Sequence, residues 1–108
     1  MTRTVYLNGE YFSENEAKIS IFDRGFLMAD AVYEVTSVLD GKLIDFKGHA
    51  DRLNRSLDEL GMKNPIPYEE LLAIHRELVR LHLAGYSPVP SCSRRCTDYF
   101  SYSFGGYY

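Results

Sequence analysis

Hydrophobic and polar residues alternate near the start of the chain and predict a first hairpin. Residues 5–12 read VYLNGEYF, with an Asn8-Gly9 pair at the centre. Both residues of the pair tolerate positive φ, which is typical of a two-residue type I′ turn between short antiparallel strands. After a polar link, residues 19–22 supply a short apolar segment.

The same kind of pattern predicts a second hairpin further along the chain. Residues 31–38 are dominated by β-branched side chains in alternating positions, which favours a strand with at least one buried face. The Asp40-Gly41 pair supplies a turn, and residues 42–46 are expected to return antiparallel to the first strand.

From residue 49 onward, the apolar period changes to that of helices. Leucines at three- and four-residue spacings predict a helix over about 49–60, and Gly61 stands where a glycine often ends a helix. A broad apolar face predicts a second helix over about 69–83. Strands followed by helices indicate an α+β fold, in which an antiparallel sheet from two hairpins packs against two helices.

The last part of the chain differs in composition. Residues 85–108 contain no Leu, Ile or Lys and are rich in Ser, Tyr and Gly. We therefore expect one domain over residues 1–84 and a divergent tail over 85–108, for which a frameshift or an unrelated terminal exon is the preferred explanation. A genuinely ordered aromatic tail is the alternative. Cys92 and Cys96 are expected to be incidental thiols, because two cysteines cannot complete a zinc site.

Composition and charge exclude several classes of protein. The 108 residues are 45% hydrophobic and 25% charged, with a net charge of -3, which suits one modest globular domain. Scattered basic residues give no footprint for nucleic acid. No apolar run approaches the ~20 residues of a membrane span, and the N-terminus lacks the apolar core of a signal peptide. A cytoplasmic protein is the resulting expectation.

Two side chains are candidates for binding an anionic small molecule. Arg52 is expected in the first turn of the helix over 49–60, where a planar guanidinium and the helix N-terminus both suit a phosphate. Tyr33 lies within a predicted strand, and its hydroxyl could donate to a substrate carboxylate. From the residues alone, an ion-paired surface arginine and a core or interface tyrosine are the commoner alternatives. The carboxylates expected near Arg52 are Asp51, Asp45 and Glu59.

Other polar positions are expected to be structural. Asp23-Arg24-Gly25 is predicted to form a tight turn, with an Asp-to-backbone hydrogen bond and Gly25 in the left-handed region. His75 and His82 are too far apart on their predicted helix to share a metal ion. No metal site is therefore expected.

The order of these features resembles a known family over roughly residues 3–80. The segment FDRGFLMADAVYEVTSVLDGKLIDFKGHADRL, from Phe22 to Leu53, is similar to the small N-terminal domain of the class IV (fold-type IV) aminotransferases, which use pyridoxal 5'-phosphate. Within that family it looks most like the D-amino-acid aminotransferases. The resemblance implies that Arg52 binds the cofactor phosphate and that Tyr33 helps to hold the substrate α-carboxylate. It also implies small-molecule substrates, an amino acid and a 2-oxo acid, and a homodimer.

The resemblance equally implies what this chain lacks. In the family, the lysine that forms the Schiff base belongs to the larger C-terminal domain, and no lysine here is expected at the buried end of a strand. No catalytic residue is therefore assigned, and the chain alone is expected to be an inactive, truncated aminotransferase. A branched-chain-amino-acid aminotransferase, a non-catalytic dimerisation module and a gene product without a selected role are the alternatives. The lysines are Lys18, Lys42, Lys47 and Lys63.

Overall fold

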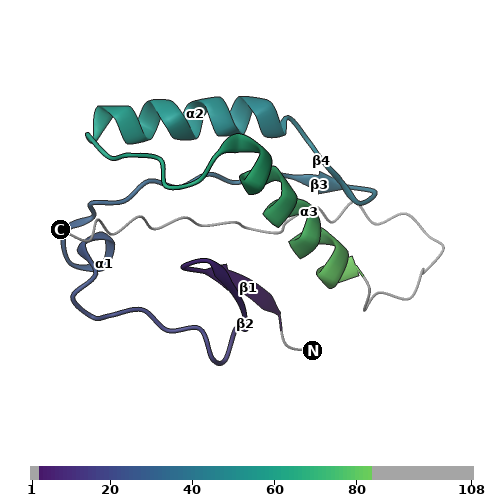
Figure 1. Cartoon of the computed structure of the whole chain (residues 1–108), viewed down its shortest axis with the longest axis horizontal. Coiled ribbons are helices and arrows are strands. Elements are labelled where there is room, and N and C mark those ends of the chain that lie inside the picture. The colour runs from purple at the N-terminus through teal and green to yellow at the C-terminus, as the bar shows by residue number, and fades with distance from the viewer. Residues whose placement is uncertain (1–2, 84–108) are drawn as a thin grey trace.

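The computed structural model describes residues 3–83, which form two hairpins and three helices (Figure 1). The tail predicted over 85–108, with both cysteines, lies outside the described residues, and the domain boundary before it stays a prediction. The α+β class predicted from the sequence is confirmed. The elements are β1 (Thr4–Leu7), β2 (Glu10–Ser13), α1 (Arg24–Met28), β3 (Val38–Leu39), β4 (Lys42–Leu43), α2 (Phe46–Glu59) and α3 (Tyr68–Leu83).

Helix α3 is the central element of the arrangement. In Figure 1 the β1–β2 hairpin lies on one side of α3, and α2 with the β3–β4 hairpin lies on the other. His82, near the end of α3, donates from Nε2 to the carbonyl oxygen of Thr4 at 3.0 Å. This bond ties the last turn of α3 to the first strand of the chain.

The first hairpin has the geometry that the sequence predicts. β1 and β2 pair antiparallel with Tyr6 opposite Tyr11, and their rings meet edge to face at 5.0 Å between centroids. Asn8 and Gly9 have φ values of 50° and 93°. Positive φ at both central positions is the requirement of a type I′ turn.

The second hairpin is shorter than predicted. β3 and β4 contribute two residues each, and the Ile44 N–H donates to the carbonyl oxygen of Ser37 at 2.9 Å just beyond them. The predicted turn is present, with φ values of 49° at Asp40 and 74° at Gly41. The two hairpins form separate two-stranded sheets instead of one sheet.

The strand predicted over 31–38 is wrong for residues 31–37, which belong to no strand or helix. A strand needs a neighbour for its N–H and C=O groups. Because the first hairpin is a separate sheet and the chain after the second turn pairs only as far back as Ser37, residues 31–36 have no such neighbour within residues 3–83. Burial does alternate along the segment, since Glu34 and Thr36 are buried and Tyr33 is exposed.

Helix α2 begins earlier than the sequence predicts. It starts at Phe46, which was expected to end a strand, and Arg52 therefore lies in the second turn instead of the first. The end of the helix is as predicted, because Gly61 takes the left-handed conformation with φ of 69°. The N–H of Gly61 donates to Asp58 O at 3.1 Å and that of Met62 to Leu57 O at 2.9 Å, which is a Schellman motif.

The hydrophobic core lies between α2 and α3. It comprises the buried side chains of Phe46, Ala50, Leu53, Leu57 and Leu71. Partly buried apolar side chains from the loops, the β3–β4 hairpin and α3 pack against this core: Val32, Leu43, Met62, Ile66 and Leu72. The apolar face of α2 packs against this core, so the opposite face of the helix can carry polar side chains.

Candidate functional site

The buried carboxylate of Glu34 joins the irregular segment before β3 to helix α2. His49 and Arg52 stand three residues apart on α2, so their side chains emerge on the same face. Arg52 donates to Glu34 from Nε at 2.6 Å and from Nη2 at 2.8 Å, and His49 Nδ1 lies 2.8 Å from Glu34 Oε2. One carboxylate thus receives three hydrogen bonds from two side chains of a single helix.

The charges at this cluster favour the ionised forms of Glu34 and Arg52. Burial alone would raise the pKa of Glu34, but the hydrogen bonds from Arg52 and His49 outweigh it and hold this pKa below its ordinary value. The Glu34 carboxylate in turn raises the pKa of Arg52, and the nearby phenol of Tyr33 adds a smaller effect. An ionised carboxylate only accepts hydrogen bonds, so Nδ1 of His49 is the donor in this contact.

Both candidates for ligand binding lie at the surface. The Arg52 side chain is 53% exposed, whereas that of Glu34 is 5% exposed. Tyr33 is 71% exposed and close enough to Arg52 to affect its pKa. Both side chains are therefore accessible from solvent, and Tyr33 directly precedes Glu34, the partner of Arg52.

Sequence reasoning missed Glu34 as the partner of Arg52. The expected carboxylates were its neighbours in sequence, but Asp51 pairs with Lys47 at 2.7 Å instead. The alternation alone does not tell which side of the segment is buried, and the structure places Glu34 on the buried side. A carboxylate at such a position needs a cation, since a buried charge without a partner is costly.

The Asp23-Arg24-Gly25 turn is the start of a short helix. Asp23 caps α1, and its Oδ1 accepts hydrogen bonds from the N–H of Gly25 at 2.8 Å and of Phe26 at 3.4 Å. The predicted Asp-to-backbone bond is confirmed. The left-handed conformation expected at Gly25 is wrong, because this residue is helical and Ala29 takes positive φ at the other end.

His75 is buried in the core, where its charged form is unfavourable. It is 1% exposed, its Nδ1 donates to Leu71 O at 2.8 Å, and its ring packs against Phe46 at 4.8 Å between centroids. Burial lowers the pKa of His75 despite the opposing effect of the bond to Leu71. Among residues 3–83, no three His, Cys, Asp or Glu side chains are grouped to hold a metal ion.

We expect acid to destabilise the fold through His75. An unfolded histidine titrates near 6.5, above the lowered pKa of His75 in the fold. The unfolded chain therefore binds more protons just below this value, and stability should fall as the pH is lowered from about 7 through the pKa that His75 has in the fold. Urea unfolding across this range measures the effect, and it should be weaker in the His75→Gln variant. Equal pH dependence in both proteins would contradict the prediction. Glu34 affects stability only at lower pH, because its pKa in the fold is lowered.

The lysines lack the surroundings that activate an amine. All four are exposed. Lys47 donates to Asp51, and this hydrogen bond raises the pKa of the ammonium group. An amine that acts as a nucleophile near neutral pH needs the opposite shift.

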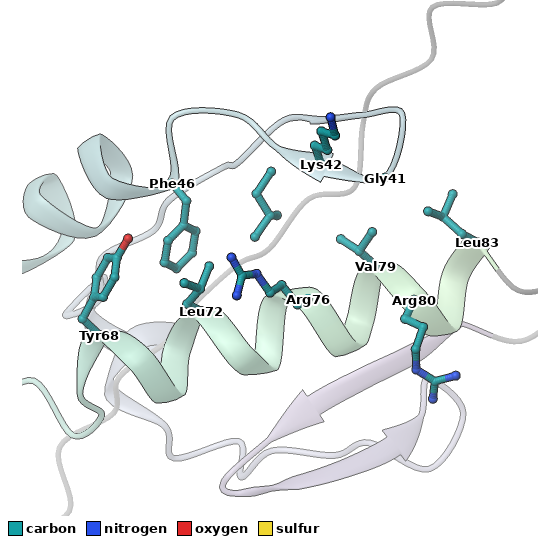
Figure 2. Close-up of a pocket in the computed structure, with 10 residues that line it drawn as sticks. Gly41, Lys42, Phe46, Tyr68, Leu72, Arg76, Val79, Arg80 and Leu83 are labelled. Carbon is teal, nitrogen blue, oxygen red and sulfur yellow. The ribbon is translucent and has the colours of Figure 1, made fainter.

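A hollow of about 490 Å³ lies apart from the cluster, between the β3–β4 hairpin and α3 (Figure 2). Its lining is mostly apolar, and neither Arg52 nor Tyr33 belongs to it. Figure 2 shows Arg76 rising from α3 toward the hairpin, whereas Arg80 points away from it. The lining residues other than these two arginines are Gly41, Lys42, Leu43, Phe46, Tyr68, Leu72, Val79 and Leu83.

The family is established by a match that contains this cluster. The family model described as amino-transferase class IV matches residues 31–86. This segment holds Tyr33, Glu34, His49 and Arg52, and it covers about half of the chain. The protein therefore belongs to the class IV aminotransferases.

Several curated relatives are similar to the N-terminal part of this chain. D-alanine aminotransferase from Staphylococcus epidermidis is 40% identical over 76 residues, which are 70% of this chain and 27% of the relative. D-alanine aminotransferase from Staphylococcus aureus is 40% identical over 78 residues, or 72% of this chain and 28% of the relative. A putative branched-chain-amino-acid aminotransferase from Methanocaldococcus jannaschii is 37% identical over 78 residues, or 72% and 27% respectively. The matched part of the chain thus spans little more than a quarter of each relative. No helix within residues 3–83 has the length and apolar character needed to cross a membrane.

Proposed function

We propose that this chain carries the phosphate-binding side of a pyridoxal-phosphate-dependent aminotransferase of the D-amino-acid type. The proposed reaction of the complete protein transfers an amino group between an amino acid such as D-alanine and a 2-oxo acid. The observation that carries the proposal is the half-exposed guanidinium of Arg52, held at 2.6 Å and 2.8 Å by the buried carboxylate of Glu34. The names of the staphylococcal relatives support the choice of substrate.

The described residues fit the phosphate end of the cofactor. An arginine has five N–H donors, of which Arg52 gives two to Glu34, so the others are available to phosphate oxygens. The exposed phenol of Tyr33 is proposed to donate to the carboxylate of a substrate bound next to the cofactor. When bound, the cofactor would supply an electron sink that stabilises the negative charge left on the substrate α-carbon when its proton is removed.

The amine required for the reaction is proposed to come from outside the described residues. All four lysines are exposed, and the pKa of Lys47 is raised. No amine within residues 3–83 is therefore suited to move a proton at the substrate carbon. For this reason we propose that the chain has no aminotransferase activity by itself.

Two other functions have specific support. The archaeal relative, 37% identical, favours branched-chain amino acids as alternative substrates. Exposed aromatic side chains favour self-association, in a homodimeric enzyme or a non-catalytic dimerisation module, since Phe22 is 76% exposed and Phe26 is 73% exposed. Sedimentation over a range of concentrations would detect this dimer, and Phe26→Ser should weaken it.

A chimeric enzyme tests the proposed function. Residues 1–83 replace the matching segment of the Staphylococcus aureus relative, and transamination is measured with D-alanine and with L-leucine. We expect activity with D-alanine, because the inserted segment supplies the phosphate and carboxylate contacts. A folded chimera that binds the cofactor but prefers L-leucine would favour the branched-chain alternative. A folded chimera that does not bind the cofactor would contradict the proposal.

A further inference from the structure

We propose that Glu34 is a positioning residue that fixes the guanidinium of Arg52 in the one orientation in which its remaining N–H groups meet a phosphate. This inference rests on the proposed function, in which Arg52 binds the cofactor phosphate. It assigns a role to a buried acid that lies next to a site for an anion, where its charge alone would be unfavourable.

The hydrogen bonds of Arg52 define a fixed plane. Nε donates to one oxygen of Glu34 and Nη2 donates to the other, at 2.6 Å and 2.8 Å. Two parallel bonds between a planar guanidinium and a planar carboxylate hold both groups in a common orientation. The Nη1 group and the second hydrogen of Nη2 remain on the edges that Glu34 does not occupy.

The carboxylate is itself held in place. Glu34 is 5% exposed at its side chain and receives a third hydrogen bond from His49 at 2.8 Å. His49 and Arg52 both belong to α2, so the carboxylate cannot turn without breaking bonds to one rigid helix. The anchored end of the pair is therefore buried, while the Arg52 end is 53% exposed and faces solvent.

A second arginine–glutamate pair forms a similar fork of two hydrogen bonds, but its carboxylate is not buried. Arg80 donates to Glu77 from Nε at 2.8 Å and from Nη2 at 2.6 Å, with nearly the same geometry. Both residues lie on the surface of α3, and the Glu77 side chain is 37% exposed. Surface pairs of this kind hold their side chains weakly. The Glu77–Arg80 pair is therefore a matched control for the Glu34–Arg52 pair.

Charge and orientation predict opposite results when Glu34 loses its charge. In Glu34→Gln the site gains one net positive charge, which by itself would strengthen phosphate binding. Glutamine, however, has only one acceptor oxygen, and its amide N–H groups face the N–H groups of Arg52. If Glu34 acts by positioning Arg52, phosphate binding should become weaker despite the added charge.

The experiment measures both motion and binding on the full chain by NMR. The 15N relaxation of the Arg52 Nε–H group reports its order, and titration with inorganic phosphate or 4′-deoxypyridoxine 5′-phosphate reports affinity. The second ligand has no aldehyde and cannot react with lysines. We expect the Nε–H group of Arg52 to be more ordered than that of Arg80. The Glu34→Gln variant should lower the order of the Arg52 group and reduce the affinity for both ligands about tenfold. Glu77→Gln should leave the Arg52 signal and both affinities unchanged.

Each other result has a distinct meaning. Equal order at Arg52 and Arg80, or unchanged or tighter binding in Glu34→Gln, overturns the positioning role but leaves the proposed function intact. An ordered Arg52 that binds neither ligand overturns both proposals. If Glu34→Gln does not fold, Arg52→Lys serves as the second variant, since lysine keeps the charge and the pairing to Glu34 but not the planar fork. Full affinity in Arg52→Lys would also overturn the positioning role.

Discussion

Replacing Leu53 by alanine is expected to lower the free energy of unfolding by about 2–5 kcal/mol. Leu53 is 1% exposed and belongs to the core between α2 and α3. Its truncation removes apolar contacts and leaves a cavity that helices of fixed geometry cannot fill completely. Because small domains are stable by only about 5–15 kcal/mol in total, this loss should shift the midpoint of urea unfolding strongly.

The matched control for this change lies on the same stretch of chain. Leu60 is 48% exposed at the end of α2, so Leu60→Ala should change stability by no more than about 0.5 kcal/mol. Urea unfolding followed by circular dichroism measures both variants. Similar losses in the two variants would show that the core does not centre on Leu53.

Replacing Arg52 by alanine is expected to weaken cofactor retention in the chimeric enzyme by about ten- to a hundredfold. The substitution removes the guanidinium that is proposed to bind the phosphate, and it leaves the acid Glu34 facing the bound anion. Titration with pyridoxal 5'-phosphate, followed by absorbance and by activity after dialysis, measures the change.

Arg55→Ala is the appropriate control for this experiment. Arg55 is exposed and lies three residues further along α2, so its removal changes the net charge by the same amount. We expect this variant to keep its cofactor, since the two hydrogen bonds to Glu34 that hold the guanidinium come from Arg52. Equal losses in the two variants would mean that the general charge of α2, and not the Arg52 fork, retains the cofactor.

Glu34 links the two proposals made for this protein. Its low pKa depends on Arg52 and His49, and the orientation of Arg52 depends on Glu34. Protonation of Glu34 at a pH below its lowered pKa would release one edge of the Arg52 fork. Phosphate binding and the stability that this cluster contributes should therefore decline in the same acidic range.

Some features of this protein could be read from the sequence because they depend on neighbouring residues alone. The turns at Asn8-Gly9 and Asp40-Gly41 and the helix end at Gly61 take their conformation from residues that tolerate positive φ. The apolar stripe of α2 follows from the spacing of leucines. The family likeness was also visible in the sequence, because it rests on the order of such local motifs.

Only the tertiary structure decided how the remaining residues are used. The alternation over 31–38 could not reveal whether a neighbouring strand exists, and without one within residues 3–83 most of this segment forms no strand. The partner of Arg52 is 18 residues away in sequence and comes within reach because the chain before β3 passes beside α2. Hydrogen bonding within a turn is set by adjacent residues, whereas the pairing of a buried acid with a cation depends on how distant segments pack.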